Sequence, residues 1–341
     1  MRVLVVMNFG ADPATPQRGR WVVDQVEALR EEGLDVDLFS FQPGKDQYLP
    51  ATRRIRQMLR DTSYDLVHAH YGLAGWCAQL AGADPLVVTF HGTDVRHRVV
   101  GRMSRILTRR IALVAGASRS LFEEEAGRPG LPMPEGRSAV LPCGADLSRF
   151  SPSDRASSRN ALGLDPYVPF LFFPADPDRP EKRADRARQV ASAAGAKLIT
   201  GGGIEPDQMP LWMNASNAVL VTSDYEGFGL ACLESLACDV PVLSTPVGIA
   251  PHALRGLPQS LCLDFDPGAW GDFASGLLSQ ADPRTDGRAR AEALSARRMA
   301  DRVALAYRDL LEPERQGGPE FSGKSGGARV SGGDIGNDGG N

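Results

Sequence analysis

The sequence predicts an α/β protein made of two doubly wound domains that face each other across a cleft. At 341 residues, the chain is long enough for two domains of ordinary size. Short apolar runs alternate with amphipathic ones along most of it, as expected for parallel strands covered by helices on both faces. One polar stretch, residues 149–160, interrupts the alternation and predicts a linker, so we expect domains at residues 1–150 and 151–312.

The N-terminal half carries the first alternating series. Its apolar runs have the length of strands, and the segments between them carry apolar residues at helical spacing. Strands are expected at residues 3–7, 36–41, 66–69, 86–90, 111–116 and 139–141. Helices are expected at residues 21–31, 53–60, 73–81, 103–109 and 120–126. Because strands and helices alternate, the sheet is expected to be mostly parallel.

The C-terminal half repeats the pattern. Strands are expected at residues 170–173, 197–200, 218–221, 240–244 and 260–263. Helices are expected at residues 184–194, 208–214, 230–237, 270–278 and 288–311. The last of these helices is long enough to pack back on the N-terminal domain. A ligand is expected in the cleft between the two domains.

The end of the chain, residues 313–341, loses apolar periodicity and becomes rich in glycine and serine, which predicts a disordered tail. From Gly318 to Ser325 it matches the letters of a phosphate-binding P-loop. A P-loop needs a strand before it and a helix after it. The tail predicts neither, so we interpret this match as chance.

Composition narrows the class of protein. A net charge of −4 gives no reason to expect nucleic acid as a partner. The first seven residues are too short for a signal peptide, and no apolar run approaches the length of a membrane span. The cysteines show no C-x-x-C spacing and indicate reduced thiols rather than a disulfide framework or a zinc site. They are Cys77, Cys143, Cys232, Cys238 and Cys262. We therefore expect a cytoplasmic protein.

Two carboxylates flank a glycine-containing loop between a strand and a helix. Glu226 and Glu234 follow the apolar run at residues 218–221, and Gly227 and Gly229 between them permit close approach of the backbone. In open α/β sheets, ligands bind where the strands end. The free N–H groups of the helix start favour an anion, while the carboxylates need hydroxyl donors. The pattern therefore favours a ligand rich in both, such as a nucleotide sugar.

The segment from Asp224 to Val242 resembles the E-x(7)-E donor motif of the retaining family 4 glycosyltransferases, which have the GT-B fold of two Rossmann-like domains. This resemblance covers most of residues 1–312. It implies that Glu226 holds hydroxyls of the transferred sugar and that Glu234 holds the ribose hydroxyls. It also implies that backbone amides of the loop bind sugar and phosphate. The loop residues are Gly227, Phe228, Gly229 and Leu230.

Three further segments resemble parts of the same family. Arg179 and Lys182 lie in a loop like the one that grips the nucleotide diphosphate; the alternative is an ordinary charged surface loop. His91 begins a His-Gly-Thr-Asp loop, which would place it against the donor sugar; a single histidine after a strand is otherwise structural. Asp94 in that loop either fixes the loop or meets the acceptor. Gly19 lies where a glycine lets the backbone approach the diphosphate.

A basic segment from Arg96 to Arg110 interleaves arginines with apolar residues. Such a helix can lie on an anionic membrane. A packed helix with a solvated basic face is the alternative. Membrane contact would place the protein at the inner face of the cytoplasmic membrane.

Together these residues predict a metal-independent, retaining hexosyltransferase that needs no cofactor. It would move a glycosyl group from a nucleotide-diphosphate sugar to a glycan, lipid-linked or small-molecule acceptor. The short link at residues 201–207 resembles a compact subgroup associated with bacterial polysaccharide assembly. The sugar, the base and the acceptor stay open. The alternatives are a nucleotide-sugar 2-epimerase of the same fold and a nucleotide-sugar-binding protein without catalysis.

Overall fold

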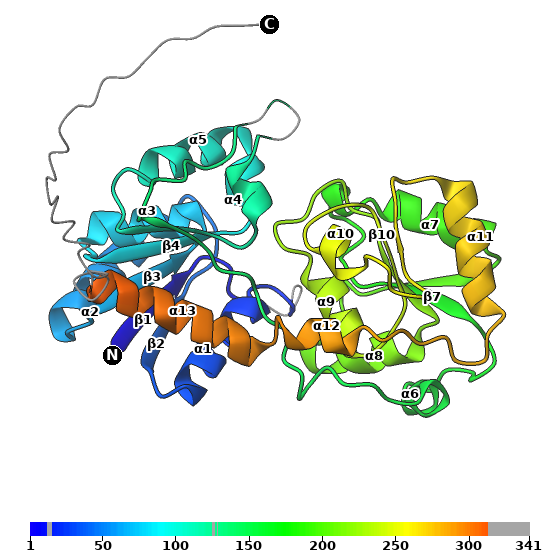
Figure 1. Cartoon of the computed structure of the whole chain (residues 1–341). Coiled ribbons are helices and arrows are strands. Elements are labelled where there is room, and N and C mark those ends of the chain that lie inside the picture. Colours follow the sequence, from blue (N-terminus) through cyan, green and yellow to red (C-terminus); the bar gives the residue numbers. More distant parts are fainter. Residues whose placement is uncertain (12–15, 125–126, 128, 313–341) are drawn as a thin grey trace, which may run out of the picture.

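The computed structural model describes residues 1–11, 16–124, 127 and 129–312. It contains two parallel β-sheets, each in its own lobe (Figure 1). This confirms the expected α/β class with two doubly wound sheets. The expected disordered tail at residues 313–341, with its P-loop letters, lies outside the described residues.

The N-terminal lobe holds a six-stranded sheet of order β2-β1-β3-β4-β5-β6. Its strands are β1 (Arg2–Met7), β2 (Asp35–Ser40), β3 (Leu66–His70), β4 (Leu86–Phe90), β5 (Leu113–Gly116) and β6 (Ser138–Val140). Its helices are α1 (Arg20–Glu31), α2 (Tyr48–Asp61), α3 (Gly72–Ala81), α4 (Thr93–Arg96) and α5 (Arg98–Leu107). The strand order reverses at β1, and the cleft opens beside that point.

The C-terminal lobe holds a five-stranded sheet of order β11-β10-β9-β7-β8. Its strands are β7 (Phe170–Phe173), β8 (Lys197–Thr200), β9 (Ala218–Val221), β10 (Val242–Ser244) and β11 (Leu261–Cys262). Its helices are α6 (Arg155–Ala161), α7 (Ala184–Ala193), α8 (Met209–Ala215), α9 (Leu230–Ala237), α10 (Ala250–Ala253), α11 (Pro267–Leu278) and α12 (Arg288–Glu292). Here the order reverses between β7 and β9, the strands that precede the two predicted donor loops.

Successive side chains of β1 point to opposite faces of the sheet, so they pack in two different layers. Leu4 and Val6 pack with the helices on one face of the sheet, while Val3 and Val5 pack on the other face. That second layer is formed by α1 together with the last helix, α13 (Ala296–Leu311), which returns from the C-terminal lobe (Figure 1). The expected domain boundaries stay a prediction.

The chain therefore passes between the lobes twice, and the two passages lie side by side. The backbone N–H of Ala145 donates to the carbonyl of Leu294 at 3.0 Å, and the N–H of Ala296 donates to the carbonyl of Ala145 at 2.8 Å. A side chain at Gly144 would meet the backbone of Ser295, so only glycine fits there. These contacts join the two connections into one short hinge.

Three expectations about elements were wrong. The helix expected at 288–311 is divided into α12 and α13, because Ser295 caps α13 and the chain there bonds to the other connection. The expected linker at 149–160 contains α6, which Asp154 caps and which buries arginines instead of an apolar face. The helix expected at 120–126 is only a short 3₁₀ turn, Arg119–Phe122, within the described residues.

The basic segment also differs in its bounds. The helix expected at 103–109 begins at Arg98 because the ring of His97 accepts the backbone N–H of Val100 at 3.2 Å, and it ends at Leu107. None of the helices in the described ranges has the length and apolar content needed to cross a bilayer.

Candidate active site

A cavity of about 190 Å³ lies between the lobes at the carboxyl ends of both sheets. The N-terminal lobe contributes Trp21, Tyr71 and His91 to its lining. The C-terminal lobe contributes Arg179, Lys182 and the loop from Glu226 to Leu230. We call this space the cleft cavity. It is where strand order predicts a ligand in each sheet.

The lobes touch at Gly227. A side chain at Gly227 would collide with the carbonyl oxygen of His91, and one at Gly92 would come within 3.0 Å of the Gly227 Cα. Glycine at both positions therefore allows backbone to meet backbone across the cleft. Gly229, with φ +95°, starts α9 in the left-handed region, which glycine adopts without strain.

The charged side of the cavity is an ion pair. The ammonium of Lys182 lies 2.7 Å from both carboxylate oxygens of Glu226, and the hydroxyl of Ser223 donates to the same carboxylate at 2.7 Å. The two charged side chains are 15 % and 14 % exposed, so water screens the pair only partly.

Arg179 is the second cation and is held differently. Its guanidinium donates through Nε, at 2.9 Å, and through Nη2 to one carboxylate oxygen of Glu181. The Arg179 side chain is half exposed. Both cations are thus paired with carboxylates, and an incoming anion would replace Glu181 at Arg179 more easily than it would displace the less exposed Glu226.

Glu234 lies on α9 one turn beyond the cavity and is not among the described residues that line it. Its carboxylate makes no hydrogen bond or ion pair with another residue of the described ranges. Burial raises the pKa of its carboxyl to about 8, against the opposing effect of Arg149. In its protonated form this carboxyl can donate one hydrogen bond as well as accept others.

Gly19 lies just before α1, with φ +73°, and a side chain there would collide with the carbonyl of Phe9. It too is absent from the described lining of the cleft cavity. The structure therefore groups His91, Arg179, Lys182 and the 226–230 loop around one space, which neither Gly19 nor Glu234 lines in the described ranges.

The His91 loop is fixed from beneath by Asp94. This carboxylate is 4 % exposed and accepts backbone N–H bonds from His91 and Gly92 at 3.0 Å and from Gly72 at 3.1 Å. Burial raises the pKa of Asp94 to about 6, and these N–H groups oppose the rise. Of the two roles considered for Asp94, the geometry favours fixing the loop.

Sequence reasoning missed Tyr71, Trp21 and Glu181. Tyr71 has φ +75° and ψ +145°, a conformation that costs a non-glycine residue energy, and its ring stacks on Phe9 at 4.3 Å. It directly follows β3, as His91 follows β4, and this position after a strand was the available signal. Glu181 could have been found as the only acid between Arg179 and Lys182.

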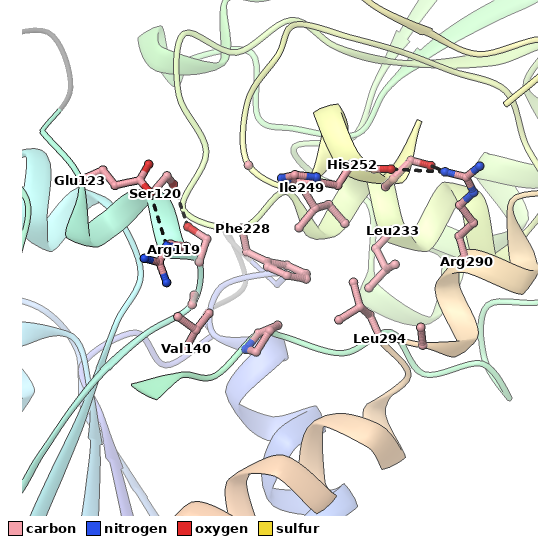
Figure 2. Close-up of a pocket in the computed structure, with 16 residues that line it drawn as sticks. Arg119, Ser120, Glu123, Val140, Phe228, Leu233, Ile249, His252, Arg290 and Leu294 are labelled. Carbon is pink, nitrogen blue, oxygen red and sulfur yellow. Dashed lines mark hydrogen bonds and ion pairs between the residues drawn. The ribbon is translucent and has the colours of Figure 1, made fainter. Parts of the chain in front are cut away.

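A larger, mostly apolar cavity of about 570 Å³ lies on the other side of Phe228, which lines both spaces. Figure 2 shows Phe228, Leu233 and Leu294 turned toward it, with Arg119 and Glu123 at one end and His252 and Arg290 at the other. It lies beside the hinge, since Val140 and Leu294 border the two connections between the lobes. Nothing in the sequence indicated it.

Within the described ranges, no group of three or more His, Cys, Asp or Glu side chains is placed to hold a metal ion. The candidate site is therefore built from two ion pairs, a fixed histidine and the backbone of the 226–230 loop. Such a set can bind an anion and sugar hydroxyls together.

Comparison with known proteins gives two family matches. The model "Glycosyltransferase Family 4" matches residues 19–149, and the model "Glycosyl transferases group 1" matches residues 181–277. A D-inositol 3-phosphate glycosyltransferase of Mycobacterium avium is 28 % identical over 74 % of this chain and 72 % of its own. The enzyme of that name from Mycolicibacterium gilvum is 30 % identical over 66 % and 61 %.

Solved structures share the fold. Sucrose-phosphate synthase from Thermosynechococcus elongatus superposes with a TM-score of 0.68 at 18 % identity, over 92 % of this chain and all of that one. HepE from Anabaena, solved with UDP-glucose, gives 0.68 at 16 % identity, over 89 % and 98 %. Both likenesses support the two-lobed α/β architecture.

Proposed function

Because the chain belongs to the family 4-like glycosyltransferases, we propose that it transfers a glycosyl group from a nucleotide-diphosphate sugar with retention of anomeric configuration. The observation that carries the proposal is the grouping of Arg179, Lys182 and Glu226 opposite His91 around the cleft cavity. Two cations suit a diphosphate, and a carboxylate suits sugar hydroxyls.

In this proposal the diphosphate takes the place of Glu181 at Arg179, whose planar guanidinium can form two parallel bonds to phosphate oxygens. Lys182 supplies a point charge that stabilises the leaving diphosphate as its negative charge develops. Neither residue must move a proton. A phosphate oxygen of the donor would accept the proton of the acceptor hydroxyl on the same face of the sugar.

Glu226 would accept hydroxyls of the transferred sugar, and Glu234 those of the ribose. The backbone N–H groups from Gly227 to Leu230 would add donors at the start of α9. The contact of Gly227 with His91 would close the cavity and exclude water. No metal ion has a part in these steps.

UDP-glucose is the first donor to test, since a structural neighbour is known in complex with it. The acceptor class stays a glycan, a lipid-linked acceptor or a small molecule such as the inositol phosphate named for the relatives. A role in bacterial polysaccharide assembly and a cytoplasmic location belong to the same proposal.

Contact with an anionic membrane would involve α5. Val99, Met103 and Ile106 are 60 %, 37 % and 44 % exposed and lie on one stripe of this helix, with Arg98 and Arg102 exposed beside them. Sedimentation with vesicles tests this contact. Binding to anionic but not to neutral vesicles supports it, and no binding to either supports a solvated basic face.

The enzymatic proposal is tested with nucleotide sugars labelled in the sugar. Purified protein is incubated with each donor, with and without acceptor candidates, and the products are separated. We expect acceptor-dependent transfer, and a fall in kcat/KM of about 100-fold in Glu226→Gln, which loses a charged partner of the sugar hydroxyls. Glu31→Gln, at an exposed position on α1, is the control and should leave the rate unchanged.

The rival functions give different results in the same assay. A 2-epimer formed without acceptor would identify an isomerase. Donor binding without any turnover, across all donors and acceptors, would identify a binding protein. An unchanged rate in Glu226→Gln would show that the assigned site is wrong.

A further inference from the structure

Two buried histidines and a partly buried one form a row beneath the cleft cavity. His68 and His70 lie on β3, on the face that carries Leu66 toward α1 and α13, and His91 follows the neighbouring strand β4. The ring centroids of His68 and His70 are 4.4 Å apart, and those of His70 and His91 are 5.2 Å apart. Only His91 reaches the cavity lining.

The row is linked by hydrogen bonds at every step. Tyr307 of α13 lies 2.6 Å from His68 Nδ1, and Thr89 Oγ1 lies 2.7 Å from His68 Nε2. The side-chain nitrogen of Gln25 lies 3.5 Å from His68 Nδ1 and 3.4 Å from His70 Nε2. His70 Nδ1 lies 2.9 Å from His91 Nε2.

All three rings are neutral at physiological pH. Burial lowers the pKa of His68 and of His91 to about 3, and in His68 the charge of His91 adds to the effect. Burial, with the charges of both neighbours, holds the pKa of His70 well below its ordinary value. A neutral imidazole has one N–H and one lone pair, so each hydrogen bond in the row must run in one direction.

Tyr307 sets that direction. Its hydroxyl is fully buried, and His68 Nδ1 is its hydrogen-bond partner, so the hydroxyl donates and His68 Nδ1 accepts. His68 therefore carries its proton on Nε2 and donates to Thr89. The opposite order would bury the Tyr307 proton without an acceptor among the described residues, at a cost of about 1–3 kcal/mol.

The direction then passes to the cavity through Gln25. The side-chain nitrogen of Gln25, which can only donate, lies between the two rings and faces both His68 Nδ1 and His70 Nε2. His70 Nε2 therefore accepts, and His70 carries its proton on Nδ1, where it donates to His91 Nε2. The proton of His91 is left on Nδ1.

We propose that His70 is a positioning residue that holds His91 as the Nδ1–H tautomer, so that His91 gives the cleft cavity a hydrogen-bond donor for a hydroxyl oxygen of the transferred sugar. This inference rests on the proposed function. Glu226 on the opposite wall can only accept. One sugar hydroxyl can then donate to Glu226 while its oxygen accepts from His91. In the other tautomer, His91 would present a lone pair to that oxygen and could not donate to it. Trp21 and Tyr71, with ring centroids 5.9 Å and 4.9 Å from that of His91, hold the plane of the ring.

The first test reads the tautomer directly. Long-range proton–nitrogen NMR correlations of the ¹⁵N-histidine-labelled full chain, without donor, identify which ring nitrogen of His91 carries the proton. His91→Gln provides the assignment. We expect Nδ1–H in the wild type and a mixture of tautomers in His70→Leu. Nε2–H in the wild type would overturn the proposal, and this measurement does not depend on whether the protein transfers sugar.

The second test uses rescue. The side-chain nitrogen of asparagine can occupy the place of a histidine Nδ1, so His70→Asn keeps the donor to His91, while His70→Leu removes it. We expect kcat/KM to fall about 10–100-fold in His70→Leu, because it leaves a buried polar group unpaired, and to recover most of that loss in His70→Asn. Equal losses in both variants, with both folded by thermal melting, would overturn the proposal.

The third test identifies the contact. Kinetics with singly deoxygenated donor analogues should show that the loss caused by His70→Leu disappears for one analogue, the one that lacks the hydroxyl bound to His91. A loss of the same size for every analogue would mean that His70 acts on the fold and not through the sugar. Inactivity of the wild type with every donor would refute the proposed function while the tautomer result stands.

Discussion

The two walls of the cleft cavity work by different physics. The C-terminal wall is charged, with Lys182 bound to Glu226 and Arg179 to Glu181, and its partners can be exchanged for those of a ligand. The N-terminal wall is neutral, and its His91 is held by the buried His70 and by the buried Asp94. This difference indicates that the charged wall attracts the ligand, while the neutral wall holds a hydrogen-bonding group in a fixed orientation toward it.

The largest effect should come from breaking the charged wall. Lys182→Met removes the partner of Glu226 and a charge that stabilises the leaving diphosphate, and it leaves a partly buried carboxylate where an anion must bind. We expect kcat/KM for the donor, measured from initial rates at varied donor concentrations, to fall about 1,000-fold or more. Lys197→Met removes an exposed lysine from the start of β8 and should change little. Similar losses in the two variants would mean that Lys182 does not stabilise the leaving diphosphate.

A smaller effect should come from separating the walls. Gly227→Ala places a methyl group against the carbonyl of His91, so the loops must move apart. We expect kcat to fall about 100-fold, since small displacements of reacting groups have effects of this order. Gly203→Ala is the control, because a side chain there meets nothing within 4 Å. A fully active Gly227→Ala would show that contact between the walls is not needed for transfer.

The smallest effect concerns the pH dependence of stability. It tests whether Glu234, which does not line the cleft cavity, is uncharged in the folded protein while Glu226 is charged. Folding raises the pKa of Glu234 to about 8 from an ordinary 4.5, so between these values the folded protein holds a proton that the unfolded chain has released. The free energy of unfolding therefore falls as pH rises from about 4.5 to 8, and this contribution is constant above pH 8.

Glu234→Gln removes that dependence. The variant should melt about 2–4 °C above the wild type at pH 8 and close to it near pH 4.5, which thermal melts at a series of pH values will measure. Glu31→Gln should follow the wild type throughout. A parallel pH dependence of Glu234→Gln and wild type would mean that Glu234 is ionised in the folded protein.

The sequence predicted the strands well because most of them, such as β3, β4, β7 and β9, are apolar runs buried on both faces. It missed α6, whose buried residues are Arg155, Ser158 and Arg159, and it missed the break before α13, which depends on bonds to Ala145. Apolar periodicity carries no signal for either. Such features are set by tertiary contacts alone.

The candidate site divides in the same way. Arg179, Lys182 and Glu226 lie in segments whose spacing resembles a family motif, so they could be named in advance. The histidine row could not, because His68 and Tyr307 are 239 residues apart and Gln25 lies on a third element. The return of α13 was expected, but the contact that it makes between Tyr307 and His68 was not, because no local pattern predicts which side chains meet.

That return also determines the order in which the protein can mature during synthesis. The surface of the first sheet that carries Val3 and Val5 is completed by Met299 and Val303, which leave the ribosome only after the elements of the C-terminal lobe have been made. Until then an apolar surface on the earliest lobe has no cover. The lobe that is made first is therefore finished last, and a nascent chain that stops before α13 would expose a surface prone to aggregation.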